Sequence, residues 1–242
     1  MSNKNLLILG ASSDVGCALI EQVYNDYDMI AAHYCNNCEN LDNLISNYGN
    51  KIKKIQANFL NDESTNKMIS NIEQLKQDIT HIVHLPALNI KNIKFQKLKW
   101  EDIERELTVE LKSVYKVLNK FLPLMAKREF GKVVFMLSSN TYYPAKYQSS
   151  YITVKYALLG LMKALSHEYA EKKININAVS PSMMETKFLN DISDLIVQKN
   201  AEDNPMKRNA NVQDVVPIIK MLLSDDAKFI TGQNILISGG SR

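Results

Sequence analysis

The sequence has few cysteines and no long apolar segment. Its 242 residues include three cysteines, Cys17, Cys35 and Cys38, an odd number that does not fit a disulfide framework. Cys35 and Cys38 form a C-x-x-C pair, but a structural zinc site needs four ligands and no second pair follows. We therefore expect reduced cysteines at a loop and helix start, with no metal site. No run of about 18 apolar residues occurs, and the apolar run near the N-terminus is too short for a secretory signal. We expect a cytoplasmic protein that does not enter a membrane.

A strong excess of charge of either sign is also missing. The chain has 29 Lys and Arg against 26 Asp and Glu, a net charge of +3, which favours neither nucleic acid nor an anionic membrane as a partner. Hydrophobic residues make up 45% of the chain, enough for a sizeable core. No linker rich in Pro, Gly or Ser, no low-complexity tract and no short repeat interrupts it, so we expect one domain over residues 1–242.

The sequence does contain a regular alternation of short apolar runs and longer segments of helical period. The strand candidates are 6–10, 28–34, 51–59, 80–87, 131–139, 173–181 and 234–240. The helix candidates are 14–25, 38–48, 61–77, 100–127, 149–171 and 211–224. Near-continuous apolar strands separated by helices predict an α/β fold with a parallel sheet that is covered on both faces. The segment at about 183–209 fits this rhythm least well, and we expect it to be a mobile lid over a site.

Ligands of such sheets bind beyond the carboxyl ends of the strands. There, after the first strand candidate, stands "GASSDVG", in which Gly10 and Gly16 bracket Ser12, Ser13 and Asp14. Glycine allows a tight turn and lets backbone N–H groups approach a pyrophosphate at the start of the following helix. Many strand-to-helix turns need glycine for geometry alone. The motif by itself therefore leaves dinucleotide binding and a plain turn both open.

The end of the second strand candidate has no acidic residue. A carboxylate there would bind the adenosine ribose hydroxyls of NAD, whereas NADP needs its extra phosphate accommodated. "AAHYCNN" offers no acid before Glu39, which favours NADP(H) over NAD(H). No arginine stands here, so Ser12, Ser13 and Asn36 would hydrogen-bond the phosphate.

Tyr151 and Lys155 head the helix candidate 149–171 and, four residues apart, share one face. Beside a nicotinamide, the Lys155 charge would lower the pKa of Tyr151, and the phenol could then protonate a carbonyl as hydride arrives. Ser138 ends a strand candidate and could hold the substrate oxygen at the same rim. A Tyr and a Lys at this spacing also occur by chance, so it is the combination with Ser138 and the glycine turn that favours catalysis.

In these features the chain resembles the short-chain dehydrogenase/reductases, especially members similar to 3-oxoacyl-[acyl-carrier-protein] reductases. The resemblance spans essentially the whole chain and rests on "GASSDVG", on "GKVVFMLSS" with "YITVK" thirteen residues after Ser138, on "ININAVSPSMMETKF" and on "FITGQNILISGG". It implies a single Rossmann-type doubly wound domain with a seven-stranded parallel sheet, and an NAD(P)H-dependent carbonyl reductase. By this resemblance Ser138 positions the carbonyl, Tyr151 is the acid and base, and Lys155 binds the nicotinamide ribose. Thr186 matches the residue that holds the carboxamide, and Asn58 the residue beside adenine.

The resulting cofactor site is a set of residues from the ends of the strands. Its members are Gly10, Ser12, Ser13, Asp14, Val15, Gly16, Asn36, Asn58, Phe59, Pro86, Ala87, Tyr151, Lys155, Pro181, Met184 and Thr186.

Three positions depart from the family pattern. The glycine turn lacks its middle glycine, and "HLPA", residues 84–87, stands where the family has Asn-Asn-Ala-Gly. Glu110 takes the place of the family's catalytic asparagine, which holds a water behind the lysine; the carboxylate could hold water or pair directly with Lys155. The histidines at positions 33, 81, 84 and 167 are expected to be hydrogen-bonded structural residues.

The substrate is not specified by these residues. Lys127, Arg128 and Lys172 resemble the basic residues that dock an acidic carrier protein in relatives, although cations at helix C-termini also complement the helix dipole. A 3-ketoacyl group, free or carrier-linked, is the leading substrate. The alternatives are a sugar or polysaccharide precursor, or a catalytically impaired cofactor-binding partner in a mixed assembly. The resemblance also implies a homo-oligomer, a tetramer or a dimer.

Overall fold

The strands of the protein form one parallel sheet, seen in a computed structural model that describes residues 3–190 and 192–241. The strands are β1 (Asn5–Leu9), β2 (Met29–Tyr34), β3 (Ile52–Gln56), β4 (His81–His84), β5 (Gly131–Met136), β6 (Ile174–Pro181) and β7 (Asn234–Ile237). The seven strands lie in the order β3-β2-β1-β4-β5-β6-β7, and every pairing is parallel. The chain therefore reverses its winding direction between β1 and β4, the point at which such sheets bind ligands.

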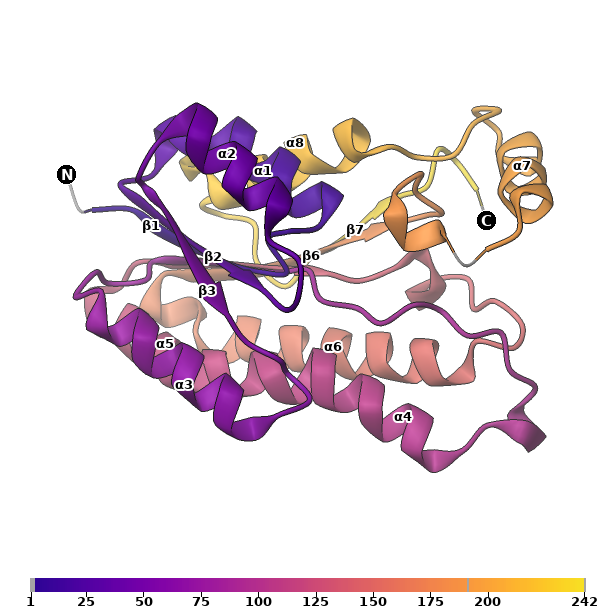
Figure 1. The fold of residues 1–242 in the computed structure, drawn as a ribbon, viewed down its shortest axis with the longest axis horizontal. Coiled ribbons are helices and arrows are strands. Elements are labelled where there is room, and N and C mark those ends of the chain that lie inside the picture. Colours follow the sequence, from indigo (N-terminus) through magenta and orange to yellow (C-terminus); the bar gives the residue numbers. More distant parts are fainter. Residues whose placement is uncertain (1–2, 191, 242) are drawn as a thin grey trace.

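Helices cover both faces of the sheet (Figure 1). The α-helices are α1 (Asp14–Val23), α2 (Glu39–Tyr48), α3 (Asp62–Gln74), α4 (Trp100–Glu106), α5 (Ser113–Arg128), α6 (Ser149–Glu168), α7 (Asp194–Asp203) and α8 (Val212–Leu223). A π-helix, η3 (Leu107–Lys112), joins α4 to α5. The short 3-10 helices are η1 (Tyr24–Asp26), η2 (Phe95–Lys97), η4 (Ser139–Thr141), η5 (Ala170–Lys172), η6 (Lys187–Leu189) and η7 (Asp225–Ala227). Helices α1, α2 and α8 lie on one side of the sheet and α3 to α6 on the other.

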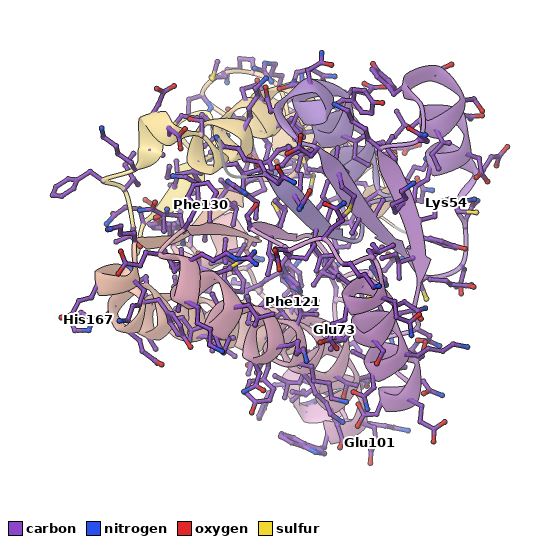
Figure 2. All side chains as sticks on the ribbon, turned by 90° about the vertical axis from the view of Figure 1, so that its left-hand side faces the viewer. Lys54, Glu73, Glu101, Phe121, Phe130 and His167 are labelled. Carbon is purple, nitrogen blue, oxygen red and sulfur yellow. The ribbon has the colours of Figure 1, made fainter. Side chains whose placement is uncertain are left out.

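Two apolar cores follow from the alternation of side chains along the central strands. Leu6 and Ile8 of β1 belong to the core shared with α1, α2 and α8. Leu7 and Leu9 belong to the core shared with α3, α5 and α6. Side chains fill the space between the sheet and each helix layer (Figure 2). This double burial explains why β1 reads as a continuous apolar run instead of an alternating one.

The structure confirms the expected fold class and shows two features that periodicity did not reveal. The helix candidate 100–127 is three consecutive helical elements with η3 in the middle. The segment from Met183 onward contains η6 and α7, and α7 lies beyond the carboxyl ends of the strands, apart from both helix layers (Figure 1). Helix α7 has no fully buried residue, so the core-facing stripe that marks a helix in a sequence is weak there.

Candidate active site

A cavity of about 1030 Å³ runs along the carboxyl ends of the strands. Segments that follow all seven strands line it, and the segment after β6 contributes residues as far along the chain as Asn200. Of the sequence-predicted site residues, all but Gly16 line this cavity. It also receives side chains that sequence reasoning did not single out, including Arg105, Tyr143, Lys187 and Phe188. Arg105 and Tyr143 come from a helix end and a loop, whereas Lys187 and Phe188 end the segment "ININAVSPSMMETKF", in which they had been given no role.

The glycine turn after β1 is held in one geometry by its own backbone. Gly10 has φ +77°, a conformation that favours glycine. A Cβ on Gly16 would lie 2.5 Å from the Ala11 carbonyl oxygen, so Gly16 acts from behind the cavity by allowing α1 to approach the turn. The Ser13 hydroxyl caps α1 by accepting the Gly16 N–H at 3.1 Å. The N-terminus of α1 thus faces the cavity and fits a pyrophosphate.

His33 fixes the same turn from the neighbouring strand, which confirms the hydrogen-bonded structural role predicted for it. Its Nδ1 accepts the Gly10 N–H at 3.0 Å, so Nε2, 3.1 Å from the Ala57 carbonyl, carries the proton. The ring stacks on Phe59 with centroids 4.2 Å apart. Burial lowers the pKa of His33 to about 4, against a smaller raising effect of the Ala57 hydrogen bond. The imidazole is therefore a neutral structural bridge between β2, β3 and the turn.

The far end of the cavity carries neutral polar groups. Asn36, Asn37, Asn40 and Asn58 line it beside Cys35. No carboxylate lines this end of the described cavity, and amide groups are compatible with the extra phosphate of NADP. All three cysteines are free, and Cys38 directly precedes α2. The described part of the chain contains no cluster of ligands suited to a metal ion.

Ser138, Tyr151 and Lys155 come together at the middle of the cavity. Ser138 follows β5 and caps η4, accepting the Asn140 N–H at 3.2 Å. Tyr151 and Lys155 stand in the first two turns of α6, and the Lys155 Nζ lies 5.3 Å from the centre of the Tyr151 ring. Tyr151 is 7% exposed and Lys155 1% exposed. A hydroxyl, a phenol and an ammonium thus line the cavity together, and all three side chains are largely shielded from solvent.

Opposing effects act on the pKa of Tyr151. Burial raises the pKa of Tyr151, and the Glu110 and Glu106 charges add to that rise. Lys155 and a hydrogen bond with Ser138 lower the pKa, as anticipated, but burial outweighs them. Lys155 thus acts on the pKa of Tyr151 in the predicted direction, and burial sets the net rise in the protein without a bound cofactor.

Glu110, whose charge contributes to the raised pKa of Tyr151, pairs directly with Lys155. The Lys155 Nζ lies 2.8 Å from Glu110 Oε2, and both side chains are buried. Burial works against the charged form of Lys155, yet Glu110 and Tyr151 raise the Lys155 pKa on balance. Lys155 also donates to the Met136 carbonyl at 3.3 Å. Of the two arrangements considered for a carboxylate at position 110, direct pairing with the lysine is the one observed.

The "HLPA" segment passes under the glycine turn. The Pro86 nitrogen would lie 3.3 Å from a Cβ on Gly10, and Leu85, Pro86 and Ala87 line the cavity. His84 is fully buried, and burial together with the Lys155 charge lowers its pKa to about 3. The "HLPA" segment therefore places the neutral imidazole of His84 near the buried Lys155.

The segment after β6 is hydrogen-bonded to the first turn of α1 and to the end of the sheet. The Lys187 N–H donates to the Asp14 carboxylate at 2.7 Å, and Asn204 donates to the Ser238 carbonyl at 3.0 Å. Met183, Met184, Phe188, Leu189 and Ile192 bring apolar side chains into the cavity. This segment thus adds an apolar surface to the cavity that Tyr151 also lines. In the described residues, no helix is long and apolar enough to cross a membrane.

Comparisons with known proteins agree with this architecture. Residues 10–242 match the family model described as enoyl-(acyl carrier protein) reductase. A 3-oxoacyl-[acyl-carrier-protein] reductase FabG from Staphylococcus epidermidis is 26% identical over 243 residues, covering 98% of each chain. One from Aquifex aeolicus is 30% identical over 195 residues, covering 80% of this chain and 77% of the relative. The solved structure "ElxO with NADP Bound" superposes with a TM-score of 0.87 at 26% identity, covering 98% of both chains. The chain therefore belongs to the short-chain dehydrogenase/reductase family of NAD(P)-dependent oxidoreductases.

Proposed function

We propose that this chain is an NADPH-dependent ketoreductase that reduces the 3-oxo group of an acyl thioester to an alcohol. The observation that carries the proposal is the burial of Tyr151 beside Ser138 and Lys155 in a cavity that begins at the glycine turn. The family relatives named as 3-oxoacyl-[acyl-carrier-protein] reductases support the reaction type.

Each of the three side chains has one task in this proposal. The Ser138 hydroxyl donates to the substrate carbonyl oxygen and holds it beside the phenol. Tyr151 gives its proton to that oxygen, and Lys155 stabilises the tyrosinate that remains. NADPH, when bound, supplies the hydride. The high pKa of Tyr151 in the free protein keeps the phenol protonated, as a general acid must be before it acts.

The preference for NADPH rests on the far end of the cavity. Asn36 and Ser12 offer hydrogen bonds where a carboxylate would repel the extra phosphate. The solved relative with NADP bound supports the same choice. Gly10, Ser13, Asp14 and Val15 would then hold the pyrophosphate, with Gly16 supporting the turn from behind.

The nicotinamide half of the cofactor is assigned to the following segments. Pro86 and Ala87 would pass under it, and Pro181, Met184 and Thr186 would hold its carboxamide side. At the other half of the cofactor, Asn58 and Phe59 would flank adenine. All of these residues line the cavity.

The apolar wall of the lid favours an acyl group over a sugar. Leu88, Ile90 and Val109 extend the apolar lining contributed by the segment after Met183. A sugar would leave its hydroxyls unpaired against such a surface. We infer that residues 183–209 form a substrate lid that opens from the Asp14 contact, and that the chain acts as one domain.

A carrier protein is a further candidate partner. Lys127 and Arg128 end α5 and Lys172 lies in η5, at the amino ends of β5 and β6 and thus at the sheet edge opposite the cavity. Arg128 already pairs with Asp78. If these cations dock an acidic carrier, charge reversal of Lys127, Arg128 and Lys172 to Glu slows turnover of a carrier-linked ketone and spares a small thioester. Equal effects on both substrates exclude this docking mode.

We infer that the chain assembles with copies of itself. A hollow of about 440 Å³ between α4–η3–α5 and α6 is lined by Leu107, Leu111, Tyr115, Ala157 and Leu161. Tyr115 is 55% exposed in the isolated chain, and β7 is a half-buried edge strand. Both features suit a second copy of this chain.

The free cysteines suit a reducing compartment, and we place the protein in the cytoplasm.

The experiment that tests the proposed function is a substrate panel with NADPH. An acetoacetyl thioester should be reduced much faster than a keto-sugar nucleotide, and NADPH should be used in preference to NADH. Preferred turnover of the keto-sugar would favour the sugar alternative. If the wild-type protein is nearly inactive and Glu110→Asn raises its turnover by orders of magnitude, the impaired-partner alternative is supported instead.

A further inference from the structure

A second buried carboxyl lies next to the Lys155–Glu110 pair. Glu106 is the last residue of α4 and stands one turn before Glu110, which lies in the π-helix η3. Residues four apart share a helix face, and both side chains are buried, with Glu106 6% and Glu110 0% exposed. π-helical turns are rare and frequently occur at functional sites.

Each of these carboxyl groups has one oxygen without a partner. Glu106 Oε2 and Glu110 Oε1 are buried and accept no hydrogen bond from the described residues. A buried carboxylate without a partner is costly. Lys155 supplies a single positive charge, which Glu110 Oε2 already accepts. One additional proton in the cluster would balance its charge and give an unpartnered oxygen a donor.

Within the described part of the chain, Lys155 is the one cation among the groups that face Glu106. Lys155, Tyr151 and the Ser150 hydroxyl face it from α6, Glu110 from η3 and Asp102 from the preceding turn. Asp102 is itself paired with Lys91 at 3.0 Å. Burial raises the pKa of Glu106 and the Glu110 charge adds to the rise, while Ser150 and Lys155 oppose it. On the far side of Glu110, His84 is neutral because burial and Lys155 lower its pKa to about 3.

We propose that Glu106 carries a proton that it shares with Glu110, and that this carboxyl pair resupplies Lys155 with a proton after each reduction. The inference rests on the proposed function. Tyr151 loses its O–H proton to the substrate oxygen, and the ammonium of Lys155 loses an N–H proton to the tyrosinate. A proton then leaves the Glu106 carboxyl, passes through Glu110 and forms a new N–H bond on Lys155. Water reprotonates Glu106, so the reduction consumes one solvent proton.

Glu106→Gln tests the proposal because the amide keeps the shape of the side chain and cannot carry the proton. Glu101→Gln is the matched control, since Glu101 is exposed on the first turn of the same helix and points away from the protein (Figure 2). Infrared spectroscopy at neutral pH should detect a protonated buried carboxyl in the wild type and in Glu101→Gln, and not in Glu106→Gln. Multiple-turnover reduction should be roughly a hundredfold slower in Glu106→Gln, with an altered pH profile and unchanged NADPH affinity.

Glu106 acts through Lys155, so it is a positioning and proton-supplying residue, and Glu106→Asp should restore part of the rate. A wild-type protein without the protonated-carboxyl band overturns the proposal, whether or not the variant folds. So does a Glu106→Gln enzyme with the wild-type rate and pH profile. If the band is present and lost in Glu106→Gln while no variant reduces any ketone, the shared proton stands and the proposed function fails.

Discussion

The Lys155 ammonium donates to the Glu110 carboxylate at 2.8 Å in a site where neither side chain is exposed to more than 1%. This ion pair joins the first half of α6 to the π-helix η3. It fixes Lys155 beside Tyr151, and it places a negative charge close enough to raise the pKa of that tyrosine. The ion pair therefore bears both on the stability of the protein and on the pKa of Tyr151.

Removing one partner of this pair should destabilise the protein strongly. Glu110→Ala leaves the buried Lys155 charge without its partner, and we expect a loss of about 3–5 kcal/mol in the free energy of unfolding. The double substitution Glu110→Leu with Lys155→Met removes both charges and should recover most of that loss. Urea unfolding of the three proteins measures the difference. A loss below about 1 kcal/mol in Glu110→Ala would mean that the pair is not formed.

Neutralising Glu110 while keeping its shape should move the pH dependence of the reaction. Because the Glu110 charge raises the pKa of Tyr151, Glu110→Gln should lower that pKa and shift the basic limb of the kcat profile to lower pH. Glu73→Gln on α3, an exposed glutamate paired with Lys120, is the control. An unshifted limb, or a shift to higher pH, would contradict the electrostatic account.

The glycine turn should tolerate no side chain at Gly16. Gly16→Ala places a Cβ 2.5 Å from the Ala11 carbonyl oxygen, so the turn must shift and NADPH affinity should fall by roughly tenfold or more, the effect of losing about 1.4 kcal/mol. Gly160→Ala on α6 is the matched control, because a Cβ there meets nothing within 4 Å. Fluorescence titration of NADPH gives both affinities. Equal affinities in the two variants would show that the turn does not hold the cofactor.

Three buried histidines should make the protein sensitive to mild acid. Burial lowers the pKa of His33 to about 4 and of His81 and His84 to about 3, whereas an unfolded histidine titrates near 6.5. Below about pH 6.5 the unfolded chain binds protons that the folded chain does not. The free energy of unfolding therefore decreases as the pH is lowered, until the folded pKa values are reached. Each imidazole contributes roughly 1.4 kcal/mol per pH unit in this window.

Urea unfolding of the cofactor-free protein between pH 7.5 and 5 measures this slope. His33→Gln removes one titrating imidazole, so its slope should be about a third smaller than that of the wild type. An identical slope in the two proteins would mean that His33 titrates normally when folded.

Most of the fold was predictable because the central strands are buried on both faces and the helices carry clear apolar stripes. The glycine turn and the Ser138, Tyr151 and Lys155 set were predictable because all of them follow strand ends or open a helix. Direct pairing of Glu110 with Lys155 was one of two arrangements that the sequence left open, because the approach of Glu110 depends on an irregular helix, η3, whose sequence, "LTVELK", reads as ordinary helix. The sequence predicted a structural role for His33 but not its partners. These partners, Gly10 and Ala57, are distant from His33 in sequence and meet it only through the strand register.

Cofactor binding and turnover, compared in the wild type and in Tyr151→Phe, show whether Tyr151 donates the proton in an NADPH-dependent reduction. NADPH is first titrated by nicotinamide fluorescence, and an acetoacetyl thioester is then added to follow NADPH oxidation. We expect tight NADPH binding to both proteins, with oxidation that is present in the wild type and lost in Tyr151→Phe. Undiminished oxidation in Tyr151→Phe, or no NADPH binding by the wild type, would contradict this expectation.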